Sequence, residues 1–148
     1  MSQLAAALAD PVRRAAVVRD AAALVESEVA SKRGLRAMAL KGGFKAFRAI
    51  QPGMMARVVS KLLPHFVPVI DPIWVEAQGQ SDPKRWMTSQ DQRVADALLD
   101  VTDGLAQRAK NRVMIRIYKS LRGQARGHVI AAVPGLADLL GHHTALEA

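Results

Sequence analysis

Cysteine is absent from the 148 residues of this chain. Without it there can be no disulfide bond, thiolate zinc site, cysteine-bound iron–sulfur cluster or cysteine nucleophile. A cysteine-free chain also suits a reducing compartment, so we expect a cytoplasmic protein.

Aromatic residues and long uncharged runs are scarce as well. Only six residues are Phe, Trp or Tyr although half of the chain is apolar, so Ala, Val, Leu, Ile and Met must fill the interior, a mixture that suits packed helices. The longest run without Asp, Glu, Lys or Arg is the eleven-residue segment 127–137, whereas a membrane-spanning helix needs about 20 residues. The first basic residue is Arg13, but a secretory signal carries positive charge ahead of its apolar core. We therefore expect neither a transmembrane segment nor export.

Capping and periodicity signals predict an all-α fold. Asp10-Pro11 is a strong helix start, because aspartate can cap free N–H groups and proline fits the first helical position. A helix is therefore expected over residues 11–33. Residues 35–50 and 54–63 carry apolar side chains at helical spacing and are predicted to form the next two helices.

Proline and glycine mark the expected interruptions. The apolar segment 64–74 contains three prolines, which lack an N–H group, so we expect it to pack across helix ends or to form short helical turns on the core. Residues 78–84 are the most loop-like segment. After Thr88 the pattern predicts one long helix or two stacked helices. The candidate breaks in that part are Gly104 and Gly123, and its expected end is Pro134-Gly135.

Together these elements predict a single compact helical bundle of about five to six helices, with a Pro-rich apolar connection in its middle. A chain of this length can bury roughly 68–70% of the surface that its unfolded form exposes, which is enough for one core. We expect one domain over residues 1–148, in which segments 1–9 and 141–148 are frayed.

Acidic residues are missing from two long segments of a chain whose formal net charge is +8. Residues 29–70 contain eight basic residues, and residues 104–137 contain seven. At about 100° per residue, six cations of the second segment share one stripe of a continuous helix, with Ile115 as an apolar exception. That stripe would be roughly 27 Å long. It consists of Arg108, Arg112, Arg116, Lys119, Arg122 and Arg126.

A second group of cations, Lys41, Lys45 and Arg48, lies on the predicted helix 35–50. These residues and the stripe are the candidate anion-binding residues. Two interpretations stay open for them. The cations bind an anionic partner, or carboxylates fold back on them as surface ion pairs worth ~0–1 kcal/mol each. The carboxylates available for such pairing are Glu26, Glu28, Asp91, Asp96, Asp100 and Asp103.

The sequence contains no readable catalytic or metal-binding pattern. No serine lies in a Gly-x-Ser-x-Gly turn, and Gly42-Gly43 lacks the pattern of a phosphate-binding loop. His142-His143 is the one histidine pair, but neighbouring residues on a helix point about 100° apart, and no carboxylate stands at ligand spacing. We therefore assign no catalytic residue, metal ligand or cofactor and expect a protein that is not an enzyme.

Four short motifs carry a family resemblance: Ile50-Gln51-Pro52-Gly53, then Leu62-Leu63-Pro64-His65-Phe66 with Asp71-Pro72-Ile73-Trp74, then Val94-Ala95-Asp96-Ala97-Leu98-Leu99, and finally Tyr118-Lys119-Ser120-Leu121-Arg122-Gly123. With these motifs in this order, the chain resembles a small, uncharacterised all-helical family of bacterial proteins, of the kind catalogued as a domain of unknown function. The resemblance covers about residues 10–140. It implies a helical fold and no particular chemistry.

The charge pattern favours a binding role. Our first expectation is a nucleic-acid backbone, because arginines outnumber lysines five to two in segment 104–137 and a guanidinium can hold phosphate through two donors. The second is peripheral binding to an anionic membrane surface through helix 35–50, whose apolar side carries Leu40, Phe44 and Phe47. The third is an adaptor or homo-oligomer without an anionic ligand, built on alanine-rich helices.

Overall fold

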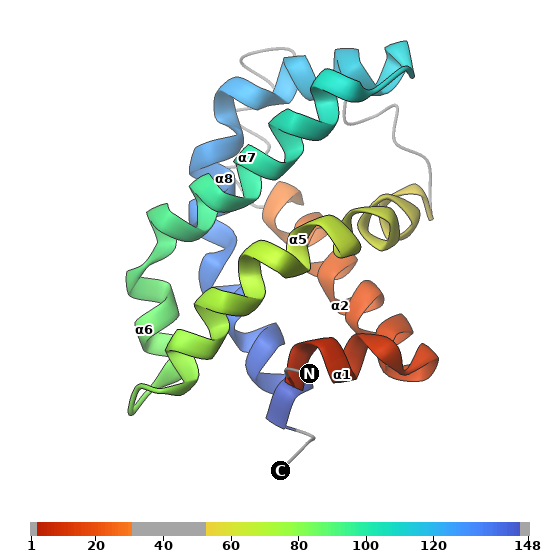
Figure 1. Ribbon diagram of the computed structural model, residues 1–148. Coiled ribbons are helices and arrows are strands. Elements are labelled where there is room, and N and C mark those ends of the chain that lie inside the picture. Colours follow the sequence, from red (N-terminus) through yellow and green to blue (C-terminus); the bar gives the residue numbers. More distant parts are fainter. Residues whose placement is uncertain (1–2, 31–52, 146–148) are drawn as a thin grey trace.

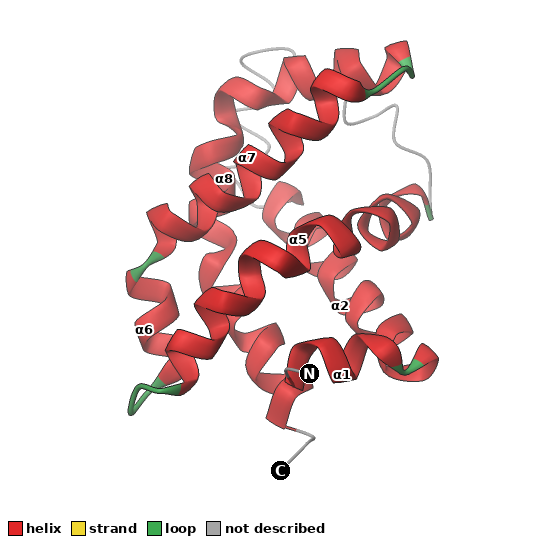
Figure 2. Cartoon of the chain, viewed as in Figure 1, coloured by secondary structure: helices red, strands yellow, loops and turns green. Residues whose placement is uncertain are grey.

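The computed structural model describes residues 3–30 and 53–145, and every regular element within these ranges is an α-helix (Figure 1, Figure 2). The prediction of an all-α bundle is confirmed. The predicted helix 35–50 lies outside the described residues. The described helices are α1 (Gln3–Ala9), α2 (Pro11–Ala30), α5 (Met54–Gln78), α6 (Pro83–Ser89), α7 (Asp91–Arg108) and α8 (Arg112–Ala145).

Helix α8 organises the bundle. It packs against α1, α2, α6 and α7, and Figure 1 shows it running from the end of α7 to a position beside α1. One group of buried apolar side chains combines residues of α1, α5, α6, α7 and α8, so segments far apart in the sequence share one core. Its members are Leu4, Ile70, Ile73, Trp74, Ala77, Met87, Val94, Val133, Ala137 and Leu140.

Asp-Pro pairs begin two of the helices. The Asp10 carboxylate accepts a hydrogen bond from the backbone N–H of Val12 at 3.3 Å, which confirms the predicted start of α2. Asp82 accepts one from the N–H of Arg85 at 3.1 Å, with Pro83 at the first helical position of α6. The expected loop 78–84 is therefore shorter than predicted.

The predicted Pro-rich connection over residues 64–74 is wrong, because these residues continue helix α5 without a break. The alternative of short helical turns on the core is right about the helical conformation and wrong about the length. Its three prolines recur at intervals of four and lie on one exposed face. The opposite face carries the buried residues Ile70, Ile73, Trp74 and Ala77. Burial of those side chains favours the helix, while solvent can reach the proline side, where main-chain hydrogen bonds are missing.

The Ser60 carbonyl is the first group that a proline of α5 leaves without its helical donor. Pro64 stands four residues later and has no N–H to offer it. The Arg14 guanidinium of α2 takes that place, since Nη2 donates to the Ser60 carbonyl at 2.8 Å. Its other terminal nitrogen, Nη1, donates to Ser60 Oγ at 3.0 Å. A side chain of α2 thus compensates for a proline in α5.

By length and composition alone, α5 is also the one described helix that could cross a membrane, and 17% of its most apolar window is buried in the bundle. The core helix of a folded domain can meet the same criterion. One face of α5 supplies four residues to the core and packs against α1, α2, α6 and α7, while most of its apolar window lies outside that core.

The predicted breaks in the C-terminal half are also wrong. The chain leaves the helical conformation between α7 and α8, where Asn111 Oδ1 accepts hydrogen bonds from the N–H groups of Val113 at 2.9 Å and Met114 at 3.1 Å. This is an asparagine N-cap, and it fixes the start of α8. Gly104 lies inside α7, and Gly123 and Pro134-Gly135 lie inside α8.

The described parts of both chain ends are helical and packed where the sequence suggested fraying. Leu4 and Ala7 of α1 expose 3% and 0% of their surface. At the other end α8 continues to Ala145, and the buried Thr144 hydroxyl accepts a hydrogen bond from Trp74 Nε1 at 3.2 Å. Tertiary contacts hold these short segments, which have little helical stability of their own.

Candidate anion-binding surface on α8

The six cations of the predicted stripe do not form one continuous face. Arg108 is the last residue of α7, and residues 109–111 separate it from α8. The prediction of a single 27 Å stripe fails because Asn111 caps a new helix inside it. The other five cations stay on α8, over its first four turns.

Two of those five cations are neutralised by carboxylates of α7. Arg122 forms a bidentate pair with Asp103, with Nε–Oδ1 at 2.8 Å and Nη2–Oδ2 at 3.0 Å. Arg126 Nε donates to Asp96 Oδ1 at 2.9 Å. For these two arginines the structure supports the ion-pair interpretation, and it removes them from the candidate anion-binding residues.

The Asp103 pair belongs to a small polar network at the crossing of α7 and α8. The Tyr118 hydroxyl donates to Asp103 Oδ1 and lies 2.8 Å from Thr102 Oγ1. The hydrogen bonds from Arg122 and then from Tyr118 lower the pKa of Asp103 to about 2. Burial and the contact with Asp103 raise the pKa of the Tyr118 hydroxyl.

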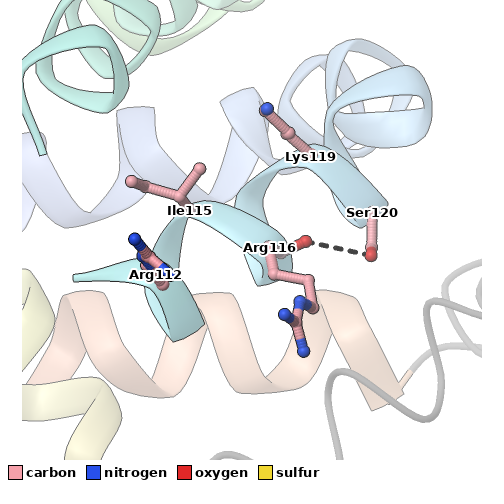
Figure 3. A pocket seen from close by; sticks show the side chains of 5 residues that line it. All are labelled: Arg112, Ile115, Arg116, Lys119 and Ser120. Carbon is pink, nitrogen blue, oxygen red and sulfur yellow. Dashed lines mark hydrogen bonds between the residues drawn. The ribbon is translucent and has the colours of Figure 1, made fainter. Parts of the chain in front are cut away.

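The cations before Tyr118 on α8, together with Lys119, have a different environment. Arg112, Arg116 and Lys119 line an open hollow of about 480 Å³ together with Ile115 and Ser120. Figure 3 shows these side chains along one stretch of α8, with the Ser120 hydroxyl turned onto the Arg116 carbonyl at 3.0 Å. Ile115, the apolar exception of the predicted stripe, is half-buried among them.

Five exposed cations form a group around the corner between α7 and α8, which we call the corner cations. None of them makes an ion pair with another residue in the parts of the chain described. The candidate residues Lys41, Lys45 and Arg48 lie outside the described residues, so the site described is built from the end of α7, the linker 109–111 and α8. The corner cations are Arg108, Lys110, Arg112, Arg116 and Lys119.

A second polar group, which the sequence pattern did not reveal, lies at the other end of α8. His143 Nε2 is 2.7 Å from Asp20 Oδ2 of α2, and the ring of His142 meets that of His143 edge-on at 4.9 Å between centroids. Among the described residues, Asp20, His142 and His143 are the group of side chains that could hold a metal ion. Asp20 is 123 positions from His143, so no local spacing signal could have found the pair.

Comparison with known proteins supports the resemblance noted in the four motifs. No curated protein and no solved structure matches this chain. A family model does match, over residues 4–144, which is nearly the whole chain. The chain therefore belongs to the family of unknown function DUF6918.

Proposed function

We propose that this chain is a cytoplasmic, non-enzymatic module that binds the phosphate backbone of a nucleic acid through the corner cations. The observation that carries the proposal is the hollow on α8, where Arg112, Arg116 and Lys119 have no carboxylate partner among the described residues. Elsewhere on the same helix, carboxylates of α7 do pair with cations. Four of the corner cations, Arg108, Arg112, Arg116 and Lys119, belong to the predicted stripe and form no ion pair within the described parts of the chain.

The arrangement of these side chains favours a polyanion over a single small anion. In Figure 3 the Arg116 guanidinium and the Lys119 amine extend in different directions from the helix, so they do not converge on one point. From Arg112 to Lys119 the helix rises about 10 Å, and duplex DNA carries one charge per about 1.7 Å of its axis. Several phosphates could therefore contact the corner cations at once.

At the corner cations a nucleic acid is favoured over a membrane, because Val113, 60% exposed, is the one large hydrophobic residue of α8 that the described structure leaves exposed. A helix lying in a membrane interface buries an apolar face beside its cations. The apolar side of α8 packs against α2, α6 and α7, and the hollow contributes one large aliphatic side chain, Ile115. Contact through the corner cations is thus mainly electrostatic, and we expect it to depend strongly on salt and weakly on base sequence.

The test compares two triple variants that remove the same charge. The first variant combines Arg112→Gln, Arg116→Gln and Lys119→Gln and so removes the three cations that line the hollow. Fluorescence anisotropy with labelled duplex DNA and single-stranded RNA should show at least about tenfold weaker binding at 0.1 M salt, and a salt slope smaller by about 2–3. The matched control removes three exposed cations of other helices, Arg57, Lys61 and Arg85, and should retain most of the affinity.

Three outcomes would speak against the proposal. Equal affinity of the two triple variants would show that only net charge matters. Affinity that stays flat between low and physiological salt would remove the phosphate contacts. A third outcome is that the unaltered chain binds anionic vesicles but no nucleic acid, and that the triple variant of the hollow loses the vesicle binding. The corner cations would then bind a membrane surface. Light scattering with and without nucleic acid identifies the remaining alternative, a homo-oligomer that binds no anion.

A further inference from the structure

We propose that Asp20, His142 and His143 bind a divalent transition-metal ion of the zinc type, joining the middle of α2 to the last turn of α8. The three side chains come from two helices that pack against each other. One ligand atom from each lies within 4.8 Å of the other two. This site is separate from the corner cations, and the proposal does not depend on nucleic-acid binding.

The distances fit a site that closes by small side-chain movements. Zinc bonds of about 2.0–2.2 Å place tetrahedral ligand atoms about 3.3–3.5 Å apart. The Asp20–His143 contact, at 2.7 Å, is closer because the two groups share a hydrogen bond, and the widest separation in the group is 4.8 Å. His142 is exposed, so its ring can rotate towards the other two ligands.

The anchor of the site is His143, which is 3% exposed. Its main-chain carbonyl accepts a hydrogen bond from Arg13 Nη2 at 3.1 Å. The next residue, Thr144, donates to the Leu140 carbonyl at 2.7 Å and accepts from the buried Trp74 indole at 3.2 Å. The last turn of α8 is therefore held from two sides. A ligand fixed in this way loses little freedom when it binds a metal.

The other two ligands leave a route for the ion. The Asp20 side chain is 40% exposed, and His142 is exposed. Arg19 lies 3.8 Å from Oδ1 of Asp20, which is not the oxygen that faces His143, and its side chain is 77% exposed. That arginine can swing away into solvent when a cation enters.

The donor set indicates the class of metal. Two imidazoles and one carboxylate form a nitrogen-rich set that suits Zn²⁺, Ni²⁺ or Cu²⁺, whereas Mg²⁺ and Ca²⁺ prefer oxygen ligands. Three protein ligands leave at least one position of a tetrahedral zinc ion to water. The site should therefore select Zn²⁺ strongly over Mg²⁺.

The test titrates the chelator-treated full chain with Zn²⁺ at neutral pH, using calorimetry and thermal unfolding. At a Zn²⁺ concentration about 100 times Kd, the midpoint of unfolding should rise by about 5–10 °C, and Mg²⁺ should leave it unchanged. Asp20→Asn and His142→Ala should each weaken zinc binding at least about tenfold. Both replace side chains that are at least partly exposed, so the bundle should still fold.

Matched controls remove a histidine and an aspartate elsewhere. His65→Ala and Asp100→Asn alter exposed side chains of α5 and α7, and both should bind zinc as the unaltered chain does. The proposal is overturned if the unaltered chain binds Zn²⁺ more weakly than about 1 mM. It is equally overturned if the two ligand variants bind as tightly as the two controls.

Discussion

Arg14 shows how one side chain can change what a segment is able to form. Pro64 leaves the Ser60 carbonyl without an N–H partner, and both terminal nitrogens of Arg14 turn to Ser60. A buried or half-buried carbonyl without a donor costs about 1–3 kcal/mol. The proline-containing helix α5 is therefore compatible with the bundle partly because α2 carries an arginine at this position.

Replacing Arg14 tests whether its contribution to the free energy of unfolding depends on Pro64. We expect Arg14→Met to lower the free energy of unfolding by about 1.5–3 kcal/mol, because two charge-assisted hydrogen bonds are lost. The loss should be smaller in a Pro64→Ala background, where the new N–H group can bond to the Ser60 carbonyl. Urea unfolding of the four chains in this double-mutant cycle measures the coupling.

Arg57→Met, an exposed change on α5 itself, is the control and should shift stability by no more than about 0.5 kcal/mol. An equal cost of Arg14→Met with Pro64 and with Ala at position 64 would contradict the compensation. The cost would then come from packing of the arginine stem alone.

Helices α7 and α8 are joined by ion pairs between acidic and basic side chains. The acids of α7 meet cations in the middle of α8, through Asp103 with Arg122 and Asp96 with Arg126. The cations in the first turns of α8, Arg112, Arg116 and Lys119, form no ion pair within residues 3–30 and 53–145. The crossing of the two helices thus divides the basic stripe into a neutralised part and a charged part.

This crossing predicts an acid-sensitive contribution to stability. Asp103 has a folded-state pKa of about 2 against an ordinary value of 3.8. Because the folded value is the lower one, the ionised carboxylate stabilises the fold above about pH 4, and this stabilisation is lost as the pH falls towards 2. Asp103→Asn should be less stable than the unaltered chain at pH 7, and its stability should change less between about pH 4 and 2.

Urea unfolding midpoints of the variants and the unaltered chain, measured across that pH range, test this prediction. Asp100→Asn is the control, because Asp100 is exposed and makes no ion pair within the described residues. It should keep the full pH dependence of the unaltered chain. The same slope for Asp103→Asn as for this control would mean that the Arg122 pair contributes nothing measurable.

At the scale of the whole molecule, the two ends of the chain close one core. Leu4 of α1 joins Trp74 of α5 and Leu140 of α8 in the same apolar cluster. Helix α1 packs against α2, α5 and α8, and Figure 1 shows it beside the end of α8. The first helix is therefore part of the cooperative fold, even though seven residues are too few for a stable isolated helix.

Leu4→Ala tests this integration. It should lower the free energy of unfolding by about 2–5 kcal/mol, because it removes a 3% exposed side chain from the core and leaves a cavity. Val12→Ala, at a position that is 78% exposed, should cost less than about 0.5 kcal/mol. Thermal unfolding of both variants measures the difference. A cost below 1 kcal/mol for Leu4→Ala would show that α1 is loosely attached.

The fold class, the start of α2 and the family could all be predicted from the amino-acid sequence. Those features depend on local signals: the Asp10-Pro11 cap, apolar residues at helical spacing and four short motifs. The sequence also identified all the cations that now surround the hollow on α8, because helical periodicity needs only neighbouring residues.

Which of those cations pair with carboxylates, and where the second site lies, depends on contacts that form when distant segments fold together. The pairs Asp103–Arg122 and Asp20–His143 join residues 19 and 123 positions apart, and no local spacing rule connects them. The proline helix α5 depends in the same way on Arg14, which is 46 positions from Ser60. Local rules could predict a break at each proline, but the energy that permits the helix comes from burial and from a distant donor.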